Sequence, residues 1–141
     1  MSVQIQPLEG CLASATAMQA ALANSVLHLY KSSFNPSPSD PLANFTAAEA
    51  DYDAYAALTM AAWNDPILSP GSGYMILSPL EQFEVGLTDP TTPNVIGGCY
   101  LVDAAGKLRQ YVSFTAPIPM QLAGQGIPIT LTLPFPTAVT F

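Results

Sequence analysis

Charged side chains are scarce in this sequence. Of its 141 residues, 9% are Asp, Glu, Lys or Arg, whereas soluble domains carry roughly 25%. Only Lys31, Lys107 and Arg109 are basic, and the formal net charge is −7. Nucleic acids and anionic membranes are bound through clustered Lys and Arg, so the composition excludes both as partners. The shortage of charge favours a subunit that packs against other proteins over a solitary monomer.

Groups that could carry out acid–base or nucleophilic catalysis are equally few. His28 is the single histidine, and the nearby Ser25, Ser32 and Ser33 belong to no known nucleophile motif. The sequence contains no G-x-S-x-G, no phosphate-binding glycine loop and no H-E-x-x-H. We therefore expect no enzyme activity and no cofactor.

Metal-binding patterns are missing as well. Glu49, Asp51 and Asp53 lie close together, but this stretch lacks the glycine-turned loop of an EF-hand, so we predict a solvated acidic surface. Cys11 and Cys99 are far apart, with no C-x-x-C spacing, and we predict two buried free thiols.

The sequence shows no pattern typical of a membrane-spanning helix or of a signal peptide. No apolar run reaches the roughly 18 residues of a membrane-spanning helix. Residues 1–10 lack the basic segment that opens a signal peptide. We expect an unprocessed protein of one domain, made in the cytoplasm.

The strongest helical segment lies near the N-terminus. Residues 11–23 are rich in Ala, Leu, Met and Gln, which are good helix formers. Apolar residues recur there at three- and four-residue intervals: Leu12, Ala15, Met18 and Leu22. The opposite face carries no charge, so we expect this helix to be covered on more than one side. We predict an N-terminal arm over residues 1–24 that binds a partner through Leu12, Met18 and Leu22.

Residues 25–141 are dominated by short β patterns between loops rich in Pro and Gly. Alternating, β-branched and aromatic segments predict strands over residues 26–30, 55–63, 74–78, 81–88, 95–102, 107–114 and 127–133. The turn at residues 103–106 joins the clearest hairpin. One helical turn is expected over residues 47–52, with Thr46 as its cap and Glu49 reaching back. The fold class is therefore all-β, an antiparallel β-sandwich or barrel of about six to seven strands with an N-terminal helical extension.

The last predicted strand has the features of a sheet edge. Ile127 and Ile129 fall on one face, continued by Leu131 and Leu133, while prolines and threonines fall on the other. Proline lacks the N–H that a central strand donates to its neighbours. We expect Pro128 and Pro134 to lie at a partner-facing edge.

Two groups of residues form a recurrent pattern. The first comprises Leu27-His-Leu-Tyr30, Phe34-x-Pro36-x-Pro38, Leu42-Ala-x-Phe45-Thr46, Tyr55-Ala56, Thr59 and Trp63. The second comprises Ile96-Gly-Gly-Cys-Tyr100, Val102-Asp103, Gly106 and Phe114-x-Ala116-Pro117. Over about residues 26–134 the chain resembles a family of small virion proteins of tailed bacteriophages. Members of that family are structural or hypothetical proteins without an associated activity or cofactor.

The resemblance implies a structural protein of the virion, made in the host cytoplasm. The first expectation is a capsid decoration or cement protein that binds the major capsid protein or other virion proteins and stabilises the outer shell. A homotrimer at a symmetry point, anchored by residues 1–24, fits this role. The first alternative is a tail, neck or head-fibre component of the virion. The second is a carbohydrate- or receptor-binding module, which predicts exposed, coplanar rings among Tyr52, Tyr55, Trp63 and Tyr74.

Overall fold

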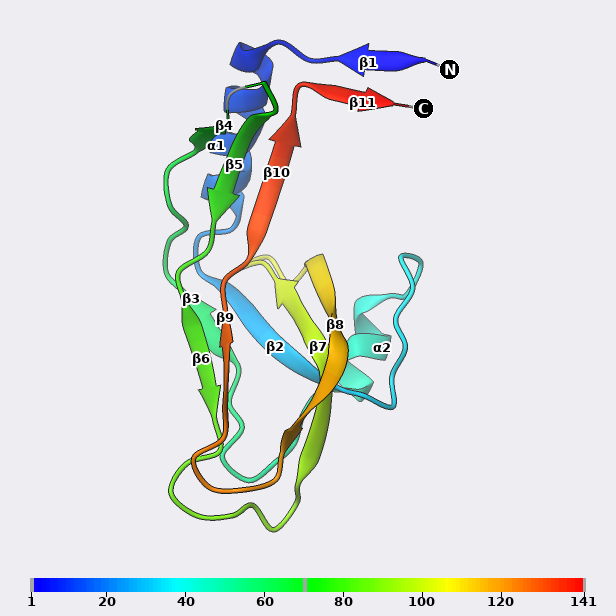
Figure 1. Ribbon diagram of the computed structural model, residues 1–141, viewed down its shortest axis with the longest axis vertical. Helices are drawn as coiled ribbons and strands as arrows, with labels where there is room; N and C mark the ends of the chain where they lie inside the picture. The colour runs from blue at the N-terminus through cyan, green and yellow to red at the C-terminus, as the bar shows by residue number, and fades with distance from the viewer. Residues whose placement is uncertain (1, 70, 141) are drawn as a thin grey trace.

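The computed structural model describes residues 2–69 and 71–140 and shows a chain that is mostly β (Figure 1). Its elements follow in this order: β1 (Val3–Ile5), α1 (Leu8–Ala21), β2 (Ser25–Lys31), α2 (Leu42–Ala47), β3 (Leu58–Met60), β4 (Ile67–Ser69), β5 (Gly73–Leu77), β6 (Glu81–Glu84), β7 (Asn94–Val102), β8 (Leu108–Met120), β9 (Gly126–Ile129), β10 (Thr132–Pro136) and β11 (Ala138–Thr140).

The strands form four antiparallel sheets. Their orders are β3-β2-β7-β8, β10-β5-β4, β6-β9 and β1-β11. The predicted antiparallel β fold with an N-terminal helix is confirmed. Within the described residues, eleven strands of 3 to 13 residues replace the six or seven expected, and no sheet closes into a barrel.

The main hydrophobic core lies against one face of the four-stranded sheet. Leu27 and Leu29 of β2, together with Leu101 of β7, pack in one cluster with Phe83 of β6 and Ile127 of β9. Each such fully buried side chain contributes about 1.5–3 kcal/mol relative to an exposed one. The core therefore holds the four-stranded sheet and the β6–β9 pair together.

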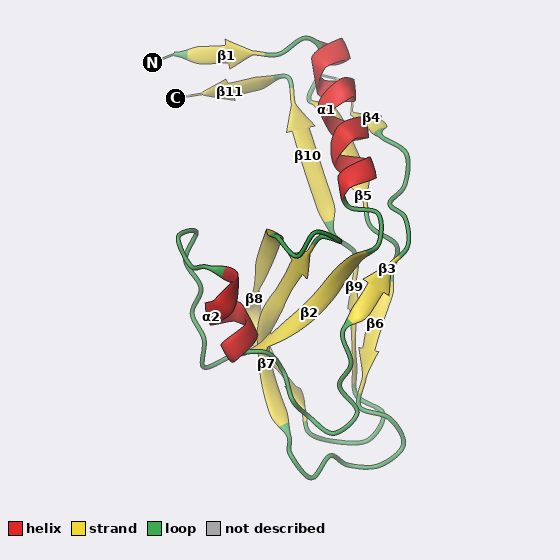
Figure 2. Cartoon of the chain, turned by 180° about the vertical axis from the view of Figure 1, so that it is seen from behind, coloured by secondary structure: helices red, strands yellow, loops and turns green. Residues whose placement is uncertain are grey.

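The other face of this sheet is covered by α2 (Figure 2). Phe45 of α2 is buried there against Tyr30 of β2 and Tyr100 of β7. The helical turn predicted over residues 47–52 is wrong, because α2 spans Leu42–Ala47. Proline fixes a backbone angle compatible with a helix start, and Pro41 sits at that start. The Thr46 hydroxyl donates to the Leu42 carbonyl, 3.1 Å away, so it does not cap a following helix.

Helix α1 packs against β5 and β10. It begins at Leu8 and ends at Ala21, earlier at both ends than the predicted 11–23. Cys11 and Ala15 are its buried residues, and Leu22 just beyond it is buried as well. The side chains of α1 that are buried within the chain thus start at Cys11, whereas Leu12, which the sequence predicts to contact a partner, is 39% exposed.

Gly97 and Gly98 have no side chains, so the Tyr30 ring can lie close over β7 and reach β8. A Cβ on Gly98 would collide with the Val112 carbonyl oxygen and with the Tyr30 hydroxyl. The Tyr30 hydroxyl donates to that same carbonyl over 3.2 Å. Opposite Gly97, β8 bulges over residues 114–117, because Ile96 pairs with Ile118 and Gly98 pairs with Ser113. The two glycines therefore serve close packing beside a bulge.

Candidate interaction surfaces

The charged residues are segregated along the chain. No Asp, Glu, Lys or Arg occurs between Glu9 and Lys31, between Asp65 and Glu81, or after Arg109. These segments hold α1, β4, β5 and β9 to β11. Figure 1 places α1, β4, β5, β10 and the β1–β11 pair together at one end of the molecule. Glu9 is the one charged residue in the elements of this end.

The same end exposes large apolar side chains. Leu8 and Leu12 lie one turn apart on α1, and Ile67 and Leu68 lie on β4, where consecutive side chains point to opposite faces of the strand. We call these four residues the apolar end. Exposed apolar side chains gathered in one region mark sites of protein interaction. Glu9 of α1 and Asp65, which accepts a hydrogen bond from Gln19 of α1, lie beside this region, so its desolvation carries little electrostatic cost as long as both carboxylates stay in contact with water.

A two-stranded ribbon, formed by β1 and β11, extends from this end (Figure 2). Val3 pairs with Thr140 and Ile5 with Ala138, and the Gln6 amide donates to the Thr137 carbonyl over 2.7 Å. Val3 is 55% exposed and Ile5 is 75% exposed. Because they are two residues apart on a strand, both side chains point to the same face. An isolated two-stranded ribbon is only marginally stable in water, so this face needs a cover.

A second candidate surface is a groove between the edges of β8 and β9, lined by apolar side chains and by Gln110, Thr130 and Thr132. Its volume is about 260 Å³. Cys99, Val112 and Phe114 line it on the side of the four-stranded sheet, and residues 128–132 line the other side. Both strands are terminal in their sheets or strand pairs among the described residues. The groove, which we call the β8–β9 groove, has no charged residue in its lining.

Gln110 places an unsatisfied polar atom at this groove. It pairs with Leu101 across β7 and β8, so its side chain shares the inner face of the sheet, and it lines the groove. Its Oε1 is shielded from solvent and finds no donor within the part of the chain that the structure describes. A buried acceptor without a donor costs about 1–3 kcal/mol. Gln110 thus lines the groove, but its unsatisfied oxygen is buried.

The residues predicted to contact a partner fall into separate places. Leu12 belongs to the apolar end, whereas Met18 is half-buried and Leu22 fully buried in the main core. Pro128 and Pro134 are exposed on β9 and β10, and Pro128 lines the β8–β9 groove. Sequence reasoning missed the exposure of four residues: Val3, Ile5, Ile67 and Leu68. The uncharged stretches around them were the available signal.

The opposite end of the molecule exposes fewer apolar side chains. Leu87 is 99% exposed and Leu122 is 58% exposed. The Gly124 amide donates to the Gly86 carbonyl over 2.9 Å, and the Ala123 amide donates to Asp89 over 2.7 Å, which joins the two loops. With acidic residues nearby in sequence, this end is a weaker candidate for an apolar contact.

The aromatic rings do not form an exposed platform. Tyr52 and Trp63 are buried, and Tyr55 and Tyr74 are half-buried against the main core. Tyr52 and Tyr55 meet at 65°, so their rings are not coplanar. Burial raises the pKa of Tyr52 to about 12. A sugar-binding surface built on these rings finds no support in this arrangement.

His28 is held in a polar contact below α2. Its Nδ1 lies 2.5 Å from Glu49 Oε1, and the Tyr55 hydroxyl donates to the same oxygen over 2.8 Å. The imidazole stacks on Tyr100, with ring centroids 4.7 Å apart. Burial raises the pKa of Tyr55 and Tyr100, which keeps both phenols protonated. These contacts fix α2 and the following segment on the sheet.

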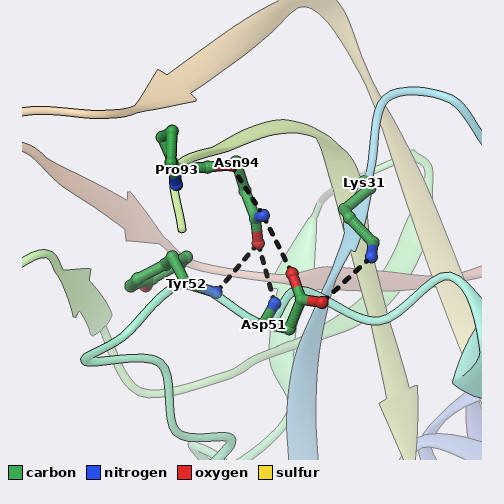
Figure 3. Close-up of polar contacts among 5 residues, drawn as sticks. All are labelled: Lys31, Asp51, Tyr52, Pro93 and Asn94. Atoms are coloured by element: carbon green, nitrogen blue, oxygen red, sulfur yellow. Dashed lines mark hydrogen bonds and ion pairs between the residues drawn. The ribbon is translucent and has the colours of Figure 1, made fainter. Parts of the chain in front are cut away.

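The three acidic residues of the predicted cluster have separate partners. Glu49 binds His28 and Tyr55, whereas the Asp53 carboxylate accepts from the Thr91 amide and hydroxyl. Asp51 contacts Asn94 and Lys31 (Figure 3). Hydrogen bonds from Asn94 and then from Lys31 lower the pKa of Asp51. In the described ranges no three acidic, His or Cys side chains are placed to hold a metal ion.

Asn94 ties the segment after α2 to β7. Its Oδ1 accepts from the amides of Asp51 and Tyr52 over 2.7 and 3.0 Å, and its Nδ2 donates to Asp51 Oδ1 over 2.9 Å (Figure 3). Asn94 and Tyr52 are both buried. These hydrogen bonds have a structural role, because both of the amides that donate to Asn94 Oδ1 belong to the chain itself.

Asp103 closes the β7–β8 hairpin, and its side chain is 3% exposed. The Lys107 amide, and next the Arg109 guanidinium at 2.6 Å, lower the pKa of this carboxyl. A lowered folded-state pKa means that the stabilisation is present above the unfolded value of 3.8 and is lost as the pH falls through the folded value.

Asp103→Asn is therefore expected to lower the thermal midpoint at pH 7 and to leave a smaller difference from wild type below pH 3.8. Melting curves of both proteins between pH 7 and about pH 2.5 measure this difference. A difference that stays constant over the whole range would contradict the assignment.

Comparison of the chain with protein-family models, with curated proteins and with solved structures found no match in any of the three. No helix within the described residues is long and apolar enough to span a membrane. The functional argument therefore depends on the surfaces described above.

Proposed function

We propose that this chain is a structural protein of a virus particle, a capsid decoration or cement protein that binds the outer shell through its apolar end. The observation that carries the proposal is the coincidence, at one end, of four exposed apolar side chains with a low density of charge, Glu9 and Asp65 being the charged residues beside them. We interpret the four-stranded sheet and the β6–β9 pair packed against it as an open β-sandwich, from which the apolar end extends.

The apolar end suits a permanent contact. Stable protein interfaces bury about 800 Å² per partner, and their centres are depleted in charged residues. Burying apolar surface contributes about 25 cal/mol per Å². With Glu9 as the one charged residue in its elements, this end gains the contribution as long as that carboxylate stays at the solvated margin of the interface.

The apolar end is also presented rigidly. Leu8 and Leu12 are fixed by a helix that packs on β5 and β10, and Ile67 and Leu68 belong to a strand hydrogen-bonded to β5. Binding therefore orders few additional side chains, which limits the entropic cost of association. Shells carry many equivalent sites, and a small rigid subunit can occupy each of them.

Replacement of an apolar-end leucine by aspartate tests the proposal. Leu12→Asp and Leu68→Asp are each expected to weaken co-sedimentation with undecorated heads of the parent phage at least tenfold, because a charge would be buried without a partner. Leu87→Asp is the matched control, since it places the same charge on an exposed leucine at the opposite end.

Circular dichroism and melting curves must show that all three variants remain folded, as expected for exposed positions. Loss of binding in Leu87→Asp with retention in Leu12→Asp would move the contact to the other end. Binding of the wild type to isolated tails but not to heads would favour a tail, neck or head-fibre component.

A further inference from the structure

We propose that the side-chain amine of Lys31 and the side-chain amide of Asn94 join in an intramolecular isopeptide bond. Asp51 lies between the two groups and acts as the general base and general acid of the reaction (Figure 3). The fold brings these three side chains together although they lie 20 and 43 positions apart in the sequence. The bond is independent of the apolar end and of shell binding.

Lys31 is placed to reach Asn94 across two neighbouring strands. Lys31 is the last residue of β2 and pairs with Ile96 of β7, and Asn94 is the first residue of β7. Residues two apart on a strand share a face, so Lys31 and Asn94 are diagonal neighbours on one face of the sheet. Such neighbours lie about 7–8 Å apart, which is within reach of a long side chain. Rotation about its own bonds can therefore bring the amine to the Asn94 side-chain carbon.

The Asp51 carboxylate contacts both reacting groups. Its Oδ2 lies 3.3 Å from Lys31 Nζ, and its Oδ1 accepts a hydrogen bond from Asn94 Nδ2 over 2.9 Å. Hydrogen bonds from Asn94 and then from Lys31 lower the pKa of Asp51, so its carboxylate is ionised at neutral pH. An ionised carboxylate can take a proton from the lysine, which must be neutral to act as a nucleophile.

The side-chain oxygen of Asn94 already accepts two backbone hydrogen bonds. The amides of Asp51 and Tyr52 donate to Oδ1 over 2.7 and 3.0 Å. When an amine adds to an amide carbon, negative charge develops on this oxygen, and fixed N–H donors stabilise it. Asn94 and Tyr52 are both buried, so these donors act away from bulk water, where they are more effective. The site thus combines a nucleophile, a proton acceptor and donors for the developing charge.

The bond forms with loss of ammonia. Asp51 takes a proton from the Lys31 ammonium, and the lone pair of the resulting amine attacks Asn94 Cγ while the C=O π electrons move to Oδ1. The proton on Asp51 passes to Nδ2, and the Cγ–Nδ2 bond breaks as the carbonyl forms again. The second proton of the attacking nitrogen leaves with the ammonia, which departs as ammonium. No oxidant, reductant or further reactant is consumed.

The bond would connect β2 covalently to β7. A link between positions distant in sequence stabilises a protein mainly by restricting the unfolded chain. The linked chain is therefore expected to melt at a higher temperature than Lys31→Arg, which keeps the positive charge beside Asp51 but cannot form the amide. Stability losses in Asp51 and Asn94 variants are measured against Lys31→Arg, so that the covalent link and the hydrogen bonds are counted separately.

Intact-mass measurement of the purified full chain over several days tests the inference. The wild-type mass is expected to fall by the mass of one ammonia, and tandem mass spectrometry should identify a linked peptide pair containing Lys31 and Asn94. Lys31→Arg is expected to keep its mass, and Asp51→Asn is expected to slow the reaction about a hundredfold or more, because the proton acceptor is lost. Lys107→Arg changes the only other lysine and is the matched control, with unchanged bond formation expected.

Attack of the Val95 backbone amide on Asn94 would also release ammonia and would give a succinimide. That product needs no lysine, so ammonia loss that persists in Lys31→Arg would overturn the inference. A wild-type chain that keeps its full mass, or a linked peptide with Lys107 in place of Lys31, would overturn it as well. Circular dichroism should show that the Lys31 and Asp51 variants remain folded, because both side chains are partly exposed.

Discussion

Gly98→Ala is expected to destabilise the protein by about 3 kcal/mol, which corresponds to a fall in melting temperature of roughly 10 °C. The added Cβ would collide with the Val112 backbone carbonyl and with the Tyr30 hydroxyl. Neither atom can move freely, because β7 and β8 are hydrogen-bonded here and the Tyr30 ring is buried among Phe34 and Phe45. Thermal or urea unfolding measures the loss.

Gly106→Ala is the matched control. It adds the same methyl group where nothing lies within 4 Å, and its cost comes from a φ of +81° alone. We expect a loss of about 1 kcal/mol. Equal losses in the two variants would show that the crossing of Tyr30 over Gly98 does not set the stability of the sheet.

Asn94→Leu is expected to cost about 2–4 kcal/mol. The change keeps the approximate size of the side chain but leaves the amides of Asp51 and Tyr52 without their acceptor (Figure 3). Each buried donor left unpaired costs about 1–3 kcal/mol. Hydrogen exchange should show the lost protection at these two amides, and unfolding curves should show the loss of stability.

Asp51→Ala separates the contribution of the two amide hydrogen bonds to Asn94 from that of the Asp51 carboxylate. The variant removes the contacts of the carboxylate with Asn94 Nδ2 and Lys31 but keeps both backbone amides bonded to Asn94 Oδ1. We expect a loss below about 1 kcal/mol, since the ion pair is exposed. If Asp51→Ala costs as much stability as Asn94→Leu, the contact between the Asp51 and Asn94 side chains stabilises the segment after α2, and the hydrogen bonds from the two backbone amides do not.

The parts of the fold that the sequence predicted well depend on local patterns. The alternation of apolar and polar residues over 127–131 predicted which side chains of β9 and of the residues just after it are buried. Ile127, Ile129 and Leu131 are buried, as predicted. The hairpin around residues 103–106 is confirmed as β7 and β8. In both cases the pattern is set by neighbours along the strand or across one turn.

The parts that were missed depend on contacts distant in sequence. β1 has three residues, and its partner β11 lies at the other end of the chain, so no local period announces the ribbon. Spacing grouped Leu12 with Ala15 and Leu22, but the buried residue in this turn is Cys11, whose thiol donates to the Pro136 carbonyl of β10; spacing alone does not decide this. Alternation also predicted a strand through residue 88, yet β6 ends at Glu84 and Leu87 is fully exposed.

The candidate interaction surfaces were only partly visible in the sequence. The lack of charge on the helix pointed to this region, and Leu12 and Pro128 do lie at exposed positions. Met18 and Leu22 were placed on the same face by their spacing, but the chain uses them to fix α1 on its own core. The groove between β8 and β9 requires the folded structure, because its walls come from four strands, β7, β8, β9 and β10.

Titration of undecorated heads of the parent phage with the purified wild-type chain is the most direct test of the central claim. The account predicts saturable co-sedimentation with a fixed number of chains per head, reduced at least tenfold by Leu12→Asp and unchanged by Leu87→Asp. No binding at any chain concentration, or binding that does not saturate, would contradict it.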